Sequence, residues 1–350
     1  MLTKHKTSSF WNKQPVQTTQ ISIKNNKIPT IKKLINNYND IKLNNKLILT
    51  KKNEKWSIHD NTLKQSVLTR GRLLDKFVNF IKENYSSYVE ETELIKTFNK
   101  GVVIFLFNNN TIKGVIHFMD IRMRINNKKY RFGYTDYLTV RKGARDKNIA
   151  GRLIAKLTNY VQYKYKEALP TIYSNHKSLK RDFTHFLKIN SYSLETNILD
   201  ILISMYYQKN PDKRFVKSCK FIKDIEKEVD INKYLKQFRC TLILNRNKLK
   251  KCIGVQFENC LIIGEYKNNK KIFEIKLINI DTEYEILVHC LRTLNIYLKN
   301  EGTEMIYFND LGKNSKLEEI IPFKKVSETY YYFYNLNIDS FYSNDVICFL

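Results

Sequence analysis

The segment from Tyr134 to Tyr165 constrains the fold more than any other part of this sequence. It opens with residues that suit a pleated strand, followed by apolar residues that recur at helical spacing. The strand residues are Tyr134, Tyr137, Thr139 and Val140, and the helix residues are Ile149, Leu153, Leu157, Tyr160 and Val161. The segment therefore predicts a strand, a loop and an amphipathic helix in that order.

The loop of this unit is basic and contains Arg141, Lys142, Arg145 and Lys147. The start of a helix presents unpaired backbone N–H groups and the positive end of the helix dipole. A basic loop at that position is suited to bind a phosphate or pyrophosphate. The alternative is an ordinary strand-loop-helix unit whose basic loop is solvated and binds no ligand. Because lysine is frequent along the whole chain, the pattern by itself slightly favours this alternative over a phosphate site.

The order of predicted elements is similar in the two halves of the chain. In the first half, a helix over 68–81 precedes a hairpin over 101–124, the strand and helix described above, a strand over 169–174 and a helix over 177–189. The second half predicts strands over 260–266 and 272–280, a helix over 283–299, a strand over 305–308 and a short helix from Ser315. This repeat indicates two similar α/β domains joined near residues 205 to 215.

Composition narrows the class of protein. A chain of 350 residues is expected to form about two domains. The net charge of +27 comes from lysines spread along the whole chain, so we expect no nucleic-acid partner on that basis. Six cysteines form no C-x-x-C pair, so we expect reduced core thiols and no metal. With no signal-like segment and no apolar run of about 20 residues, we expect a cytoplasmic, monomeric protein that does not span a membrane.

Residues 136–150, DYLTVRKGARDKNIA, resemble the acyl-CoA loop of the glycylpeptide N-myristoyltransferase (N-tetradecanoyltransferase) family. Four further segments resemble that family in the same order, namely 10–16, 88–91, 234–238 and 330–335 before an apolar C-terminus. The chain resembles a shortened and divergent member. The resemblance implies a mixed-sheet α/β fold of two fused acetyltransferase (GNAT)-like domains with pseudo-twofold symmetry.

The same resemblance implies a separate role for each of three segments of the chain. Residues 1–20 would be an arm that contacts acyl-CoA, 21–208 an acyl-CoA-binding GNAT-like domain, and 209–350 a GNAT-like domain that binds the peptide. The implied activity transfers a myristoyl group from myristoyl-CoA to the N-terminal glycine amine of acceptor proteins. Myristoyl-CoA would be a substrate, with no permanently bound cofactor.

Catalysis, by this resemblance, would use main-chain groups. The backbone N–H groups of Tyr137 and Leu138 would form the oxyanion hole, and the α-carboxylate of Leu350 would be the base. The residues implied to bind the cofactor are Phe10, Trp11, Tyr137, Leu138, Thr139, Val140, Arg145, Asp146, Lys147, Asn148, Ile149 and Ala150. Those implied to bind the acceptor are Tyr88, Glu90, Glu91, Asp136 and Ser174. Independently, the apolar run 346–350 predicts a buried last strand, and scarce water there raises the pKa of a carboxylate.

Three departures from the family pattern affect these expectations. Asp146 and Asn148 stand where the family usually has serine and a basic residue, and a carboxylate beside a pyrophosphate predicts weaker CoA binding. Asp136 stands where the family has asparagine, which either strengthens ammonium binding or hinders deprotonation. The helical segment after the acidic residues 88–93 is shortened, which affects the loop expected to cover the peptide.

Two other functions stay open at this point. One is a related GNAT-type acyltransferase with a different acyl chain or amine acceptor. The other is a catalytically inactive, basic nucleic-acid-binding protein, although the chain has no RNP, KH or zinc-finger pattern.

Overall fold

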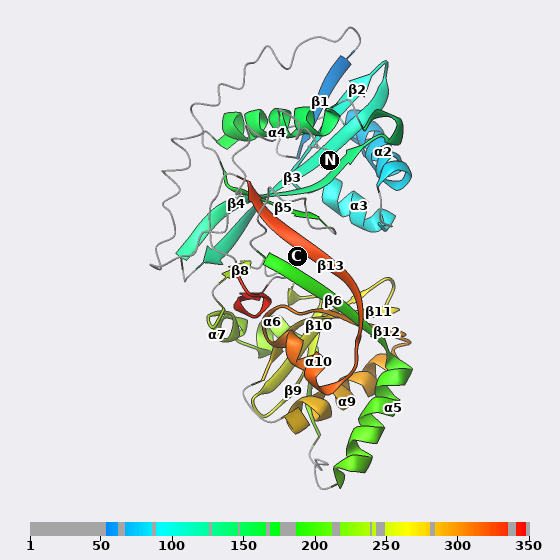
Figure 1. The fold of residues 1–350 in the computed structure, drawn as a ribbon, viewed down its shortest axis with the longest axis vertical. Helices are drawn as coiled ribbons and strands as arrows, with labels where there is room; N and C mark the ends of the chain where they lie inside the picture. Colours follow the sequence, from blue (N-terminus) through cyan, green and yellow to red (C-terminus); the bar gives the residue numbers. More distant parts are fainter. Residues whose placement is uncertain are drawn as a thin grey trace, which may run out of the picture.

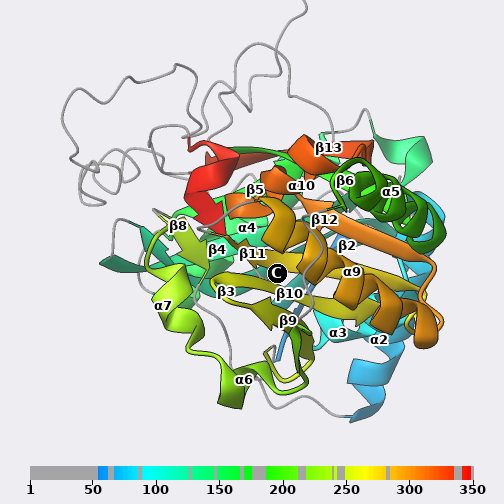
Figure 2. The ribbon, with the colours of Figure 1, turned by 90° about the horizontal axis from the view of Figure 1, so that it is seen from below.

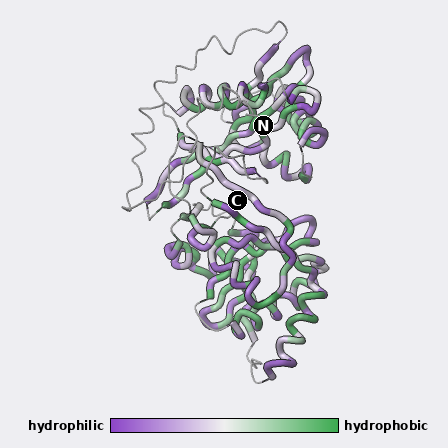
Figure 3. The backbone as a smooth tube through the Cα atoms, in the orientation of Figure 1, coloured by the Kyte–Doolittle hydropathy of each residue, from purple (hydrophilic) through white to green (hydrophobic). Residues whose placement is uncertain are grey.

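The computed structural model describes residues 54–347, apart from 62–66, 86–88, 126–127, 146–147, 166–168, 176–186, 212–217, 239, 243–248, 281–283 and 335–340. The described residues form one 14-stranded mixed sheet with helices on its faces (Figure 1). Strand order along the sheet is β1-β2-β3-β4-β5-β13-β6-β12-β11-β10-β9-β7, with β8 and β14 off this path. Hydrophobic stretches follow the strands in both halves of the molecule (Figure 3).

The N-terminal half is an antiparallel sheet with one parallel strand added after a helix. Its antiparallel strands are β1 (Glu54–Asp60), β2 (Val102–Asn108), β3 (Thr111–Ile125) and β4 (Lys128–Val140). Helix α4 (Ile149–Tyr165) then leads to β5 (Thr171–Asn175), which runs parallel to β4. The hairpin between β2 and β3 turns at Asn109 and Asn110, whose positive φ angles match the twist of the strands.

Helices cover both faces of this half. Helix α4 packs on one face through Ile149, Leu153 and Leu157. Helices α2 (Val67–Asn84) and α3 (Glu91–Phe98) pack on the other (Figure 1). Because both faces are covered, β2 is buried along almost its whole length and reads as the continuous apolar run VVIFLF.

The C-terminal half repeats this plan. Strands β9 (Cys252–Phe257), β10 (Cys260–Lys267) and β11 (Ile272–Asn279) are antiparallel. Helix α9 (Tyr284–Asn300) then leads to β12 (Met305–Asn309), which is parallel to β11. The short helix α10 (Lys316–Ile320) follows. The repeated order of elements agrees with the predicted GNAT-like α/β fold class.

Two long strands cross between the halves and make the sheet continuous. Strand β6 (Leu187–Glu195) pairs with β12 and with β13 (Lys324–Tyr334), and β13 pairs in turn with β5 (Figure 1). Helix α5 (Thr196–Lys209) follows β6 and lies beside α9, where Asn295 Nδ2 donates to Asp200 Oδ1 at 2.6 Å (Figure 2). The predicted boundary between residues 208 and 209 stays a prediction, and that position lies in the last turn of α5.

Short elements close one side of the junction between the halves. They are β7 (Lys220–Ile222), α6 (Ile225–Glu228), α7 (Ile231–Leu235), β8 (Cys240–Leu242) and β14 (Val346–Ile347). Strand β8 pairs with the end of β3 and, in parallel, with β14. The last described strand is therefore held in the middle of the molecule by the N-terminal half.

Two predictions about local structure were wrong. The helix predicted over 177–189 ends in residues that form the start of β6, because Leu187 and Ile189 are buried at the alternating period of a strand and pair with β13. Residues 176–186 lie outside the described part. The acidic segment 88–93, read as a loop, contains the start of α3, because Leu94 and Phe98 are buried one helical turn apart.

Two further expectations can be compared with the described residues. The five described cysteines are free and buried, as expected for reduced core thiols. Every described helix is either too short or too polar to cross a bilayer.

Candidate active site

Strand β4 is interrupted by a bulge at the centre of the segment that the sequence singles out. Thr139 pairs with Val115 and Asp136 pairs with His117, so that Tyr137 and Leu138 together face only one residue of β3. Tyr137 has a positive φ of 50°. A bulge of this kind removes main-chain groups from the hydrogen-bonded ladder and can re-aim them toward a ligand.

The bulge lies where β4 and β5 separate. Their parallel ladder runs from Gly133 to Thr135 on β4, and the last pair joins Thr135 to Tyr173. Asp136 and Ser174 are the residues that directly follow this last pair. The two polar side chains predicted to bind an acceptor amine therefore lie at the fork between the two strands.

The basic loop after β4 is hydrogen-bonded to Asn84, the last residue of α2. The Lys142 backbone N–H donates to Asn84 Oδ1 at 3.2 Å, and Arg145 donates to the Asn84 carbonyl oxygen at 3.2 Å. Arg141 Nε donates to the Ile112 carbonyl oxygen at 3.1 Å. The side chains of Lys142 and Arg145 are exposed, and α4 begins directly after Asn148. This loop thus places cations at the start of a 17-residue helix, which is an arrangement suited to phosphate groups.

The other side of the bulge is acidic. Burial raises the pKa of Asp136 to about 6, the hydrogen bond from the Tyr137 N–H opposes this shift, and Glu93 of α3 adds to it. The Tyr85 ring lies 5.4 Å from the Tyr137 ring, and burial, with Asp136 as a second cause, raises the pKa of Tyr85 to about 12. The candidate site therefore has an acidic part around Asp136, which precedes the bulge in the chain, and a basic part in the loop that follows it.

A cavity of about 120 Å³ is lined by residues from both halves of the molecule. Tyr134, two residues before Asp136 and therefore on the same face of β4, lines it. Val346 and Ile347 of β14 also line it, and both are buried. The last two described residues of the chain therefore line this cavity.

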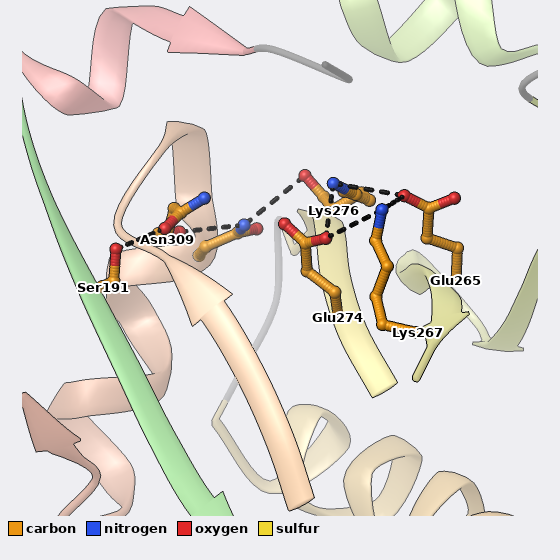
Figure 4. Close-up of polar contacts among 7 residues, drawn as sticks. Ser191, Glu265, Lys267, Glu274, Lys276 and Asn309 are labelled. Atoms are coloured by element: carbon orange, nitrogen blue, oxygen red, sulfur yellow. Dashed lines mark hydrogen bonds and ion pairs between the residues drawn. The ribbon is translucent and has the colours of Figure 1, made fainter. Parts of the chain in front are cut away.

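An ion network on β10 and β11 (Figure 4) contributes Glu274 and Lys276 to the lining of this cavity. Lys276 Nζ lies 2.7 Å from Glu274 and 3.3 Å from Glu265, while Lys267 Nζ lies 2.8 Å from Glu265. Burial lowers the pKa of Lys267, but Glu265, Glu274 and Glu93 outweigh it and leave the pKa raised. Because Glu93 of α3 acts on both Asp136 and Lys267, the two halves of the molecule face each other across this site.

The predicted site residues divide into three groups. The structure brings together, around the bulge and the start of α4, Asp136, Tyr137, Leu138, Thr139, Val140, Arg145, Asn148, Ile149, Ala150 and Ser174. Glu90 and Glu91 lie at the start of α3, next to Glu93. Six others lie outside the described residues: Phe10, Trp11, Tyr88, Asp146, Lys147 and Leu350.

Burial limits what some of these side chains can contact. Thr139 is 3% exposed and Ile149 is 4% exposed, and the Tyr137 side chain packs against Phe77 of α2. These three residues can offer a ligand their main chain rather than their side chains. Leu138, by contrast, is 38% exposed.

Sequence reasoning included Glu93 in the acidic segment 88–93 without naming it as a site residue, and it missed the ion network. The sequence contains a pattern that could have predicted the network. Glu265 and Lys267 are two positions apart on one strand of the β10–β11 hairpin, and Glu274 and Lys276 are two positions apart on the other. That spacing puts opposite charges on one face of a sheet. Among the described residues, no group of three or more histidine, cysteine, aspartate or glutamate side chains is arranged to hold a metal ion.

His117, which faces the acidic side from β3, makes stability depend on pH. It is 1% exposed, and burial lowers its pKa to about 4 from an ordinary value of 6.5, although its bond to the Lys100 carbonyl opposes the shift. Between pH 6.5 and pH 4, His117 is therefore protonated in the unfolded chain but not in the folded protein. The free energy of unfolding is highest above about pH 6.5 and decreases as the pH falls toward 4. We expect this loss to be on the order of 3 kcal/mol.

Urea unfolding of the wild type and of His117→Gln between pH 7 and pH 4 measures this effect. The raised pKa of Asp136 acts in the opposite direction and is common to both proteins, so the difference between them reports His117. Equal pH slopes for the two proteins would contradict the prediction.

The arrangement of strands and helices defines the fold class. The mixed sheet with helices on its faces is a GNAT-like fold. A GCN5-related N-acetyltransferase from Kribbella flavida has this fold, with a TM-score of 0.51 and 8% sequence identity over 80% of this chain and 71% of that chain.

A second solved protein is similar in fold over nearly the whole chain. N-myristoyltransferase of Saccharomyces cerevisiae, in a structure with bound myristoyl-CoA, superposes with a TM-score of 0.63 over 96% of this chain and 94% of that chain. A second structure of that enzyme, with bound myristoyl-CoA and inhibitors, gives a TM-score of 0.62. Sequence identity is 13% in both cases, so the likeness is one of fold. No family model and no curated protein matches the sequence.

Proposed function

We propose that this protein transfers an acyl group from acyl-CoA to an amine, and in particular a myristoyl group from myristoyl-CoA to the N-terminal glycine of acceptor proteins. The observation that carries the proposal is the bulge of β4 beside a basic loop at the start of α4. It occurs in a fold shared over 96% of the chain with an enzyme crystallised with myristoyl-CoA.

The basic loop would hold the CoA phosphates. The first turn of α4 would contribute its unpaired N–H groups, and the exposed cations of Lys142 and Arg145 would add charge. The thioester would then lie against the bulge. Main-chain N–H groups of Tyr137 and Leu138 would stabilise the oxygen that becomes negative during the reaction, and one such donor is typically worth about 3 kcal/mol of the barrier.

The acceptor would enter from the acidic side. Its ammonium would be held near Asp136 and Ser174, and its chain would pass along the face of β4 toward the cavity lined by Tyr134. The α-carboxylate of Leu350 would remove one proton from the ammonium. The amine nitrogen would form a bond to the carbonyl carbon, the C–S bond would break, and the second proton would go to the departing thiolate.

Several observations support this assignment of roles. The last described strand, β14, is buried and lines the cavity, which supports the role proposed for the α-carboxylate of Leu350. The excess of carboxylates at Asp136 and Glu93 favours a cationic ligand on that side of the bulge. A direct transfer from thioester to amine needs no nucleophilic side chain.

The proposal is tested by mixing the full chain with myristoyl-CoA and a glycine-initiated peptide and measuring amide-linked product by mass spectrometry. We expect product with that peptide and none with a matched serine-initiated peptide. Absence of product with both peptides would refute acyl transfer to N-terminal glycine. Competition between acyl-CoAs of different chain length distinguishes a myristoyltransferase from a related acyltransferase. The cytoplasmic location and the monomeric state stay predictions.

A further inference from the structure

One of the main-chain donors needed by the proposed function is already occupied. The Tyr137 N–H donates a hydrogen bond to Oδ1 of Asp136 at 2.7 Å. A carboxylate is a stronger acceptor than a thioester carbonyl, since hydrogen bonds to ionised groups are roughly twice as strong as neutral ones. While this bond persists, the Tyr137 N–H cannot serve a thioester oxygen.

The carboxylate that holds this N–H has no described counter-ion. The groups that face it are Glu93 on α3, Tyr85 after α2, Tyr137 on its own strand and His117 on β3. His117 is uncharged near neutral pH, because burial lowers its pKa to about 4, and its Nε2 lies 2.6 Å from the Lys100 carbonyl oxygen. The described charge that acts on the Asp136 carboxylate is therefore that of Glu93, which is negative.

This arrangement is unfavourable until a cation arrives. A desolvated carboxylate beside a second carboxylate is destabilised, and a positive ligand is the chemical partner that relieves it. Asp136 is nonetheless partly exposed, so a ligand can reach it from the fork between β4 and β5. The ligand class that fits is an ammonium.

We propose that Asp136 is a positioning residue that couples acceptor binding to the opening of the oxyanion hole. The ammonium of the acceptor binds the Asp136 carboxylate, the carboxylate turns toward it, and the Tyr137 N–H is released to the thioester oxygen. Acyl-CoA bound alone then faces an oxyanion hole that lacks the Tyr137 N–H, so its attack by water is slowed. This inference rests on the proposed function and adds regulation of the same site.

Nuclear magnetic resonance of the full chain labelled with ¹⁵N-tyrosine tests the hydrogen bond without any turnover. The Tyr137 amide is identified by its loss in Tyr137→Phe. We expect its proton resonance to lie downfield at pH 7.5 and to move upfield as the pH falls through about 6, where Asp136 becomes protonated. A glycine-initiated peptide at pH 7.5 is expected to produce the same upfield movement.

The matched control is the same peptide with an acetylated N-terminus, which has no ammonium and is expected to leave the resonance in place. An amide resonance that ignores both pH and the free-amine peptide would overturn the inference. It would leave the proposed function standing if amide product still forms. The reverse result, a responsive resonance without product, would refute the proposed function and the coupling that rests on it, and would leave only the binding of an ammonium at Asp136.

Kinetics of two variants give a second readout. Asp136→Asn and Asp136→Ala both remove the charge, so KM for the acceptor is expected to rise roughly ten- to hundredfold in each. Only Asp136→Ala also frees the Tyr137 N–H, so its acyl-CoA hydrolysis without acceptor is expected to exceed that of the wild type. Asp120→Asn, which breaks a surface pair with Arg131 on the same hairpin, is the control and should change neither quantity. An unchanged KM in both Asp136 variants would overturn the inference.

Discussion

Addition of three alanines after Leu350 is expected to lower kcat by about 10²- to 10⁴-fold, the range associated with loss of a positioned base. The extension moves the α-carboxylate away from the acceptor and replaces it with a neutral amide. Affinity for myristoyl-CoA is expected to stay within a factor of about two, because the proposed CoA site lies on the other side of the bulge. Single-turnover kinetics and equilibrium binding of acyl-CoA measure the two quantities separately.

The structure offers a matched control for this experiment. Three alanines inserted after Asn269, in the exposed turn between β10 and β11, lengthen the chain by the same amount away from the bulge. This variant is expected to retain wild-type turnover. Undiminished kcat in the extended protein would show that the terminal carboxylate is not the base and would leave Asp136 as the nearest described carboxylate to examine.

Replacement of Tyr332 by alanine is expected to lower the free energy of unfolding by about 3–5 kcal/mol. Tyr332 is completely buried on β13 and stacks on Tyr173 of β5, with ring centroids 5.3 Å apart. These two residues form a cross-strand pair at the contact between the halves. The substitution therefore leaves a cavity at the only described ladder that links β13 to β5.

Urea unfolding followed by circular dichroism measures this loss, with the denaturant slope as a check that the unfolded state is unchanged. Tyr342→Ala is the control, because Tyr342 is 80% exposed, and it is expected to change stability by no more than about 0.5 kcal/mol. A loss below about 1 kcal/mol in Tyr332→Ala would mean that the halves do not depend on this contact.

Local sequence patterns predicted the elements that have a clear period. The unit from Tyr134 to Tyr165 contains the second half of β4, the basic loop and α4. The second half of the chain contains β10, β11, α9 and β12 close to their predicted bounds. In these segments, apolar residues repeat every two or every three to four positions because one face of each element is buried. The repeat of this order then predicted the fold class.

Pairing between distant strands was not accessible in the same way. Strands β6 and β13 are more than 100 residues apart in sequence and yet are neighbours in the sheet. Their local patterns specify a strand but not its partner, since many registers bury the same face. The wrong helix over 177–189 has the same origin, because its last residues become a strand only when β13 is beside them.

Some parts of the candidate site could also be predicted from local sequence, and others could not. The basic loop and the start of α4 could be read from adjacent residues, since a loop and the helix it precedes are always neighbours. By contrast, Glu93, Asp136 and Lys267 come from α3, β4 and β10 and meet only after folding. The bond between the Tyr137 N–H and Asp136 joins adjacent residues, but it depends on the bulge opposite β3 and could not be read locally.

The sequence by itself determined which segments become strands and helices, and that a basic loop precedes α4, because these properties depend on residues within a few positions of one another. Tertiary structure alone decided that the last described strand, β14, pairs with β8, that the two halves exchange strands, and that a carboxylate without a described counter-ion occupies the Tyr137 amide. The physical reason is that burial, desolvation and charge pairing depend on which distant residues become neighbours in the folded chain.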